Sequence, residues 1–324
     1  MKNRIVKETS EAKILGYIFN HKGHPDTHLE NRESETIVMM ANMGISIEEN
    51  HMGRIYLRSM LIIYEKCFVH KMLHGLSGVP MNQKHWEKLE RIDRNVLRSF
   101  LNLPACTPKV SLYNELGMIP IKFMLWRRKL GMWWRLNRME SNKLMKECLK
   151  EQINLGLPWL TEINKIACKL QVDLDSAKVL KVQWKTLVKE KVLAVAKEYM
   201  EKEIATLKGY KTYVEDNIVV GKKKRYIFLT QKKAKIWFRM RTNIIDPAPR
   251  QPYSSVSIWK CKFCDQLDQS TEHYITKCEF IKKELFQSLD RGFVLRIIQT
   301  LECDEKTFLQ ITSILMKIYY LINE

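Results

Sequence analysis

Residues 82–101 read NQKHWEKLERIDRNVLRSFL, and this stretch decides the predicted fold class. Its large apolar side chains recur every three or four residues: Trp86, Leu89, Ile92, Val96, Leu97 and Phe100. That period places them on one face of an α-helix, with the charged residues on the other faces. Pro104 follows at a position where it would end the helix. The stretch therefore predicts an amphipathic helix packed in a core.

The same helical period covers most of the chain on both sides of this stretch. Helices are expected at 27–44, 54–74, 111–116, 121–139, on both sides of 156–158, at 175–207 and 231–241, and twice at the C-terminus. A shorter run, residues 12–20, is rich in β-branched and aromatic residues and predicts an edge strand or a hairpin. The predicted fold class is mainly α, with a short N-terminal strand or hairpin and a small C-terminal metal-binding subdomain.

A chain of 324 residues exceeds the usual size of one domain, roughly 100 to 200 residues. We therefore expect several units. The predicted regions are 1–25, a strand or hairpin; 26–209, a helical domain; 210–258, a basic linker; and 259–324, the metal-binding subdomain with the C-terminal helices. Alternating apolar residues within 210–229 predict a hairpin or an extended linker there, which makes it the expected domain boundary.

The formal net charge is +19 and the sequence pI is about 9.5, with the excess spread along the chain. Such a balance predicts a polyanionic partner, either nucleic acid or an anionic membrane. The longest apolar run is residues 60–64, far short of the ~20 residues that span a bilayer. No apolar stretch follows the basic N-terminus, so no signal peptide is expected. We expect a nucleic acid, no membrane and no small-molecule substrate as the partner.

Three cysteines and a histidine form the strongest local motif. Cys261, Cys264, His273 and Cys278 have the spacing C-x2-C-x8-H-x4-C. Zinc prefers four tetrahedral sulfur and nitrogen ligands, and a site whose four positions are all protein ligands is structural. We predict one structural Zn²⁺, the alternative being a chance grouping of ordinary side chains. Phe263 would either stack on a base or pack beneath the metal.

The other five cysteines are scattered singly along the chain: Cys67, Cys106, Cys148, Cys168 and Cys303. In the reducing compartment that we expect, such residues behave as small hydrophobes, and we predict that they are buried.

Two basic stretches combine cations with aromatic residues. Residues 222–241 carry nine lysines or arginines and no acid, and residues 121–139 also lack acids. Phosphates attract cations, whereas Tyr226, Phe228, Trp237 and Phe238 would either stack on bases or, as we favour, be buried in the core. The predicted nucleic-acid contacts are Phe263 and these cations: Lys122, Arg127, Arg128, Lys129, Lys222, Lys223, Lys224, Arg225, Lys232, Lys233, Lys235, Arg239 and Arg241. Residues 222–225, KKKR, also resemble a nuclear-import signal, which predicts a nuclear location with the cytoplasm as a second compartment.

Catalytic motifs are missing from the sequence. It contains no G-x-x-x-x-G-K-[ST] phosphate loop, no G-x-S-x-G and no H-E-x-x-H. Its acidic residues are dispersed over amphipathic helices, whereas two-metal phosphoryl transfer needs clustered carboxylates. The chain by itself is expected to be non-catalytic.

Several strings resemble one family. Residues 14–18, ILGYI, resemble the strand after a polymerase palm; LERIDR at 89–94 and LYNELGMIP at 112–120 resemble a helical thumb and connector. KIWFRMR at 235–241, followed by Thr271, Glu272 and the cysteine–histidine motif, resembles a terminal basic helix and knuckle. Together, over residues 12–280, the chain resembles the C-terminal part of the reverse transcriptase of non-LTR (LINE-like) retrotransposons.

The resemblance implies a thumb-like bundle that holds a template–primer duplex and a CCHC zinc knuckle that aids nucleic-acid binding. The family is an RNA-directed DNA polymerase, but its two-aspartate palm motif occurs nowhere in this sequence. The 46 residues after Cys278 also lack the endonuclease motifs of some relatives. Neither activity is therefore expected of this chain.

Three hypotheses follow for function. The chain is a nucleic-acid-binding C-terminal portion of such a reverse transcriptase; or a protein-interaction scaffold domesticated from such an element and bound to a host protein; or a thumb supplied in trans to a separate polymerase palm. Salt separates the first two, because phosphate binding weakens steeply with ionic strength and apolar docking does not.

Overall fold

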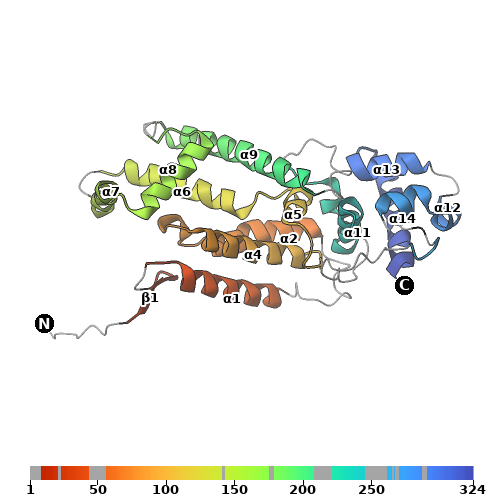
Figure 1. The fold of residues 1–324 in the computed structure, drawn as a ribbon, viewed down its shortest axis with the longest axis horizontal. Helices are drawn as coiled ribbons and strands as arrows, with labels where there is room; N and C mark the ends of the chain where they lie inside the picture. The colour runs from red at the N-terminus through yellow and green to blue at the C-terminus, as the bar shows by residue number, and fades with distance from the viewer. Residues whose placement is uncertain are drawn as a thin grey trace. The chain divides into compact units, whose positions relative to one another are not determined.

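The structure is a computed structural model. It describes residues 9–20, 23–43, 56–140, 143–174, 179–207, 220–244, 261–264, 266, 270–286 and 290–323. These residues are mainly helical, with a two-stranded hairpin near the N-terminus (Figure 1). A Cys3His cluster lies in the C-terminal part of the sequence. The predicted fold class is confirmed.

The N-terminal hairpin pairs β1 (Glu11–Ile14) antiparallel with β2 (Tyr17–Asn20). Its two-residue turn, Leu15 and Gly16, has positive φ at both positions, 48° and 80°. That backbone matches the twist of the paired strands. Arg32 donates a 2.8 Å hydrogen bond to the carbonyl of Gly16 and fixes the turn to the first helix.

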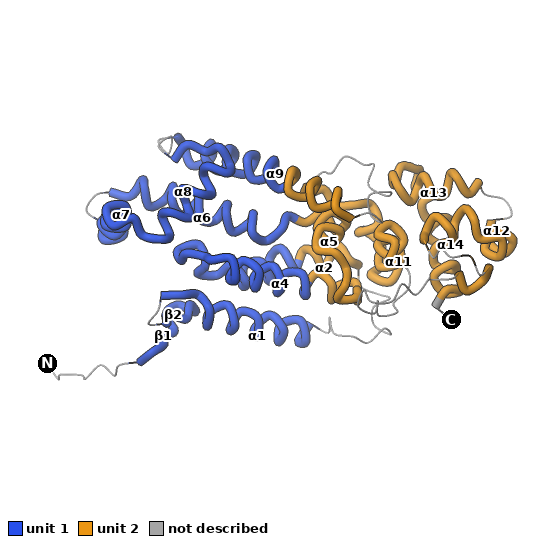
Figure 2. Tube along the Cα trace, viewed as in Figure 1, with its two compact units in different colours: residues 1–44, 63–96, 119–196 blue, residues 45–62, 97–118, 197–324 orange. Residues whose placement is uncertain are grey.

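The chain divides into two compact units, each discontinuous in sequence (Figure 2). Unit 1 contains residues 1–44, 63–96 and 119–196, and unit 2 contains residues 45–62, 97–118 and 197–324. The predicted regions follow chain order and so do not coincide with these units. Residues 208–219, where we expect the main boundary, lie outside the described residues.

Unit 1 consists of the hairpin and a set of helices. They are α1 (Asp26–Asn42), the π-turn η1 (Tyr64–Phe68), α3 (Val69–Met72), the 3-10 turn η2 (Leu76–Gly78), α4 (Gln83–Ser99), α6 (Ile121–Asn137), α7 (Leu144–Leu155), α8 (Pro158–Leu170) and α9 (Lys181–Ala205). Helices α4 and α9 continue into unit 2. Leu89, Ile92 and Val96 of α4 are buried, as the opening stretch predicts.

Helices α6, α8 and α9 are held together by buried side chains of unit 1. Trp184 of α9 donates from its indole nitrogen to the carbonyl of Leu130 on α6, at 3.3 Å. Trp159 of α8 donates to the carbonyl of Ser77, at 2.8 Å. The indole N–H groups of Trp184 and Trp159 therefore both have an acceptor, which offsets the cost of burying them.

Unit 2 also consists of helices and helical turns. They are α2 (Leu57–Ile63), α5 (Lys109–Leu116), the 3-10 turn η4 (Arg225–Phe228), α11 (Gln231–Thr242), the π-turn η5 (His273–Lys277), α12 (Glu279–Leu285), α13 (Arg291–Thr300) and α14 (Glu305–Asn323). Helix α11 packs against η4, α13 and α14 and is buried over most of its length. Within 220–229 the described backbone forms a 3-10 turn, so a hairpin is not what these residues form.

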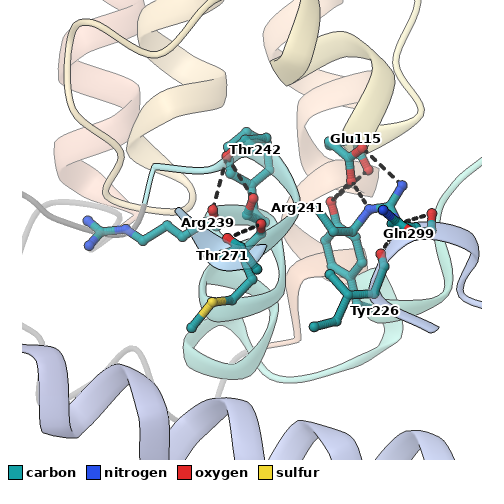
Figure 3. A network of polar contacts seen from close by, with 10 residues as sticks. Glu115, Tyr226, Arg239, Arg241, Thr242, Thr271 and Gln299 are labelled. Carbon is teal, nitrogen blue, oxygen red and sulfur yellow. Dashed lines mark hydrogen bonds and ion pairs between the residues drawn. The ribbon is translucent and has the colours of Figure 1, made fainter. Parts of the chain in front are cut away.

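A buried ion pair links four elements of unit 2 (Figure 3). Arg241 of α11 donates from Nε to Glu115 of α5 at 2.7 Å, and Tyr226 of η4 donates to the same carboxylate at 2.9 Å. The guanidinium also donates to the carbonyl of Gln299 on α13 at 2.6 Å. Burial alone would raise the pKa of Glu115, but the charge of Arg241 and its hydrogen bonds hold that pKa below its usual range.

We predict that Glu115→Gln destabilises the protein by about 3–5 kcal/mol, because it leaves the buried Arg241 cation without its counter-charge. Urea unfolding of the zinc-loaded chain measures this loss. Glu201→Gln is the matched control, since Glu201 and Lys197 form a half-exposed pair at 3.7 Å on α9. That change should cost less than about 1 kcal/mol. Equal effects of the two variants would contradict the role of the buried pair.

The same carboxylate should make stability depend on pH. Its folded-state pKa is lowered, so its contribution is complete above the unfolded-state pKa of about 4.3 and is lost as pH falls through the folded value. Unfolding free energies measured between pH 7 and pH 3 should therefore fall less in Glu115→Gln than in the unmodified chain. A parallel fall in both proteins would rule this contribution out.

Candidate metal centre and basic groove

Cys261, Cys264, His273 and Cys278 come together in one cluster, with all four ligand atoms within 4.8 Å of one another. The Sγ atoms of Cys261 and Cys278 are 4.0 Å apart, and Sγ of Cys264 lies 3.3 Å from Nε2 of His273. Zinc–ligand bonds of about 2.0–2.3 Å in a tetrahedron separate the ligand atoms by roughly 3.5–3.8 Å. The four donors are therefore spaced to hold one zinc ion, and the alternative of a chance grouping is not needed to explain their spacing.

The local backbone explains how the two ligand pairs converge. The N–H of Cys261 donates to the carbonyl of Gln266 at 2.7 Å, which closes the turn that carries the first pair. The second pair flanks η5, where the N–H of Cys278 donates to the carbonyl of His273, five residues earlier, at 2.8 Å. In an α-helix, residues five apart point about 140° away from each other. The wider π-turn instead brings both ligands to one side.

The protein surroundings of the cluster by themselves favour the neutral thiol of Cys261. Burial raises the pKa of the Cys261 thiol to about 11, although the backbone amides of Phe263 and Cys264 act in the opposite direction. A divalent ion reverses that balance because it coordinates the thiolate directly. The resulting Cys3His site has no position left for a reacting water, so its role would be structural.

The cluster is attached to the C-terminal end of α11. Thr271 donates from Oγ1 to the carbonyl of Met240 at 2.7 Å and from its amide to Oδ1 of Asn243 at 2.8 Å. Asn243 ends the helix in a left-handed conformation, with φ 56°. Phe263 stacks on Phe280 of α12, with ring centroids 4.9 Å apart. Phe263 thus packs within the metal module, and its stacking on a base stays a prediction.

Several predicted nucleic-acid contacts are buried, and for these the prediction is corrected. Lys129 is fully buried, with Nζ 3.0 Å from the carboxylate of Glu162 and 2.5 Å from the carbonyl of Val79. Arg241 is 1% exposed and paired with Glu115. Lys235 and Arg239 are also buried, at 8% and 4% exposed. A cation enclosed by the protein cannot meet a phosphate, and two of these four, Lys129 and Arg241, pair with a carboxylate of the chain instead.

The remaining predicted cations are accessible to different degrees. Exposed or half-buried are Lys122, Arg127, Arg128, Lys222, Lys223, Lys224, Arg225, Lys232 and Lys233. Some of them also contact their own chain: Lys122 lies 3.7 Å from Glu90, and Arg225 donates to the carbonyl of Cys303 at 2.5 Å. Lys232 lies over the ring of Tyr320, 4.8 Å from its centroid.

The predictions for aromatic residues and cysteines divide. Tyr226, Trp237 and Phe238 are buried as favoured, whereas Phe228 is 51% exposed beneath the guanidinium of Arg58.

The prediction that the five single cysteines are buried is wrong. Cys67, Cys106, Cys148 and Cys168 are exposed and Cys303 is half-buried. A thiol is small enough that an amphipathic helix tolerates it on either face. The apolar periodicity of the sequence therefore does not predict whether a single cysteine is buried.

A groove between α6 and α9 gathers cations that lie far apart in sequence. It has a volume of about 970 Å³ and lies within unit 1. The cations that line it are Arg127, Arg128, Arg135, Lys181, Lys185 and Lys189. No carboxylate lines it among the described residues, and no ion pair with a described acid involves any of the six. Burial and the adjacent Arg127 lower the pKa of Arg128, in agreement with a local excess of positive charge.

Four of these six cations, Arg135, Lys181, Lys185 and Lys189, are not among the contacts predicted from the sequence. Lys181, Lys185 and Lys189 recur every four residues, which places them in one row on a helix. That spacing was visible, but the mixed charge of residues 175–207 hid it. Arg135 lies eight residues after Arg127 and so on the same face of α6.

Two further observations limit the chemistry of the described part of the chain. Its one grouping of three or more histidine, cysteine or acidic side chains close enough to share a metal is the Cys3His cluster. Its helices also include none with the length and apolarity needed to cross a bilayer.

No family model, curated protein or solved structure matches this chain. The resemblance to non-LTR reverse transcriptases therefore depends on the sequence strings alone.

We predict that the purified chain carries about one zinc ion, because the four ligand atoms form one closed site. Cys264→Ser should lose the metal, and elemental analysis of the dialysed protein measures this. Cobalt substitution should give the visible absorption of a tetrahedral sulfur-ligated ion in the unmodified chain but not in Cys264→Ser. Cys106→Ser, at an exposed cysteine of the same unit, is the control and should retain the metal. Zinc retained by Cys264→Ser would contradict the four-ligand site.

Proposed function

We propose that this chain binds nucleic acid and corresponds to the thumb, connector and zinc-knuckle portion of a non-LTR retrotransposon reverse transcriptase, without a catalytic palm. The observation that carries the proposal is the basic groove of α6 and α9, where six cations face one cavity without a carboxylate. In this proposal, zinc bound by the Cys3His cluster has a structural role. The partner is RNA or DNA in the nucleus. The family assignment is supported by the sequence strings quoted above.

The physical argument begins with the repulsion between like charges. Six cations around one cavity raise its positive potential, and the cost of assembling them is offset when a polyanion enters. Other cations of unit 1 are paired with an acid, as Lys129 is with Glu162 and Lys88 with Glu30. None of the six groove cations forms an ion pair with a described acid, and a site kept positive in this way favours an anionic ligand.

A polymer of phosphates fits this groove better than an acidic peptide. Lysines and arginines form its walls, while Trp134, Met132 and Met139 add apolar and aromatic surface. Bases present flat apolar faces between phosphates, and aromatic side chains pair with them without sequence preference. The charge of +19 spread over the chain would steer such a ligand from a distance.

One observation favours the scaffold as a second candidate. Helix α7 and the residues after it expose large apolar side chains, among them Leu144 at 77%, Leu155 at 64% and Leu157 at 38%. A protein partner would cover them. A thumb acting in trans with a separate palm is a third candidate, which primer extension with a palm-containing partner would test.

We predict that binding to a labelled RNA hairpin or DNA duplex weakens steeply with salt, because bound cations release counterions from the phosphates. The variant Lys185→Gln/Lys189→Gln removes two of the groove cations and should reduce the slope of log K against log salt by about 1–2. Fluorescence anisotropy across a potassium chloride series measures both.

Lys197→Gln/Lys202→Gln is the control, because these lysines lie on the same helix outside the groove lining. The slope of log K against log salt for this control should equal that of the unmodified chain. Absent or salt-insensitive binding would reject the proposed function and favour the scaffold.

A further inference from the structure

We propose that the groove between α6 and α9 is a binding site for one strand of nucleic acid, which takes roughly three or four nucleotides and excludes a duplex. This inference deepens the proposed function and depends on it. It names the form of the ligand, which neither the charge nor the sequence strings specify.

The arrangement of the cations suits a single backbone. Lys181, Lys185 and Lys189 form a row along α9, and each step of four residues advances about 6 Å along the helix. The whole row thus extends for about 12 Å. On the facing wall, Arg127 and Arg135 of α6 are separated by two turns and cover the same length. A strand lying lengthwise would meet cations on both sides.

The size of the groove excludes a double helix. A volume of about 970 Å³ is at the upper end of the roughly 300–1,000 Å³ typical of sites for small organic ligands. The major groove of a duplex alone is about 12 Å wide and receives a whole protein helix. A duplex therefore presents its phosphates on a convex surface that only a broad, shallow face can follow. A concave site of this volume can enclose a few nucleotides of one strand.

The apolar part of the lining suits unpaired bases. Trp134 lines the groove, with its indole N–H donated to the carbonyl of Val179 at 3.4 Å and the guanidinium of Arg138 over its ring, 5.3 Å from the centroid. A base at this place would meet the apolar part of the side chain and not its N–H donor. Met132 and Met139 lie beside it in the lining. Thioethers are polarizable and adapt to flat aromatic surfaces. Bases are exposed for such contacts in a single strand, whereas a duplex stacks them inside.

The walls are anchored independently of their charged ends. Trp184 donates to the carbonyl of Leu130, and Arg138 donates to the carbonyl of Val179 at 2.9 Å. These contacts fix α6 to α9 and to the residues that precede it. Arg127, Arg135 and the lysines of α9 are exposed, so replacing them should leave the groove standing.

The test compares strands of different length and form. Anisotropy of the zinc-loaded full chain is measured with labelled oligo-dT and oligo-U of two to ten nucleotides, and with a blunt hairpin duplex of equal phosphate number. Affinity should rise steeply up to about four nucleotides, the length matched by the 12 Å row. The single strand should bind at least about tenfold more tightly than the duplex, because only the strand reaches both walls.

Two variants and a crosslink locate the site. Arg127→Gln/Arg135→Gln removes cations from the facing wall and should weaken strand binding about tenfold, whereas Lys197→Gln/Lys202→Gln should not. Circular dichroism melting confirms that each variant is folded. Oligo-U carrying 4-thiouridine should crosslink to peptides covering 127–139 or 181–189, identified by mass spectrometry.

Each failure has a separate reading. If the duplex binds as tightly as the strand, or the crosslinks lie elsewhere, the single-strand inference is overturned while nucleic-acid binding stands. If strand binding is unchanged in both Arg127→Gln/Arg135→Gln and Lys185→Gln/Lys189→Gln, the groove is not the site, and the inference is again overturned. If no nucleic acid binds at any salt, the proposed function fails together with the inference.

Discussion

The ion pair between Arg241 and Glu115 is the constraint on which unit 2 depends. Both side chains are almost fully buried, and neither charge would be stable there without the other. The pair fixes α11 to α5. The hydrogen bond that Tyr226 donates to Glu115 and the one that Arg241 donates to the carbonyl of Gln299 fix η4 and α13 to the same point. Such pairing is directional, unlike apolar contact, and so it specifies the register of four elements at once.

Helix α11 positions the candidate metal centre. Thr271 and Asn243 attach the cluster to the last turn of α11, only two residues beyond Arg241. The ion pair therefore positions the helix, and the helix end positions the ligands. Zinc would stabilise the module locally, since its loops have little apolar material, while the buried pair gives the module a fixed base.

Two helices with similar composition treat their cations in opposite ways. Helices α6 and α11 both mix arginines and lysines with tryptophan and phenylalanine and contain no acid. In α11 most of the surface is covered, and Arg241 finds a carboxylate from another element. In α6, Lys129 pairs with Glu162 and Lys122 lies near Glu90, while Arg127 and Arg135 line the groove. Desolvation explains the difference: a cation is buried only where a partner is within reach, and the others stay where water or a ligand can solvate them.

The sequence by itself determined the helical class, a strand or hairpin near the N-terminus and the four candidate metal ligands, because these follow from local rules. Apolar periodicity is read within one helix, and the ligand spacing of a metal site is read within one short segment. Tertiary structure alone decided which cations are accessible, that four of the five single cysteines are exposed, and that Lys181, Lys185 and Lys189 line one groove with Arg127 and Arg135. Each of these depends on which residues from distant parts of the chain become neighbours, and the energy of a charge is set by those neighbours and by its access to water.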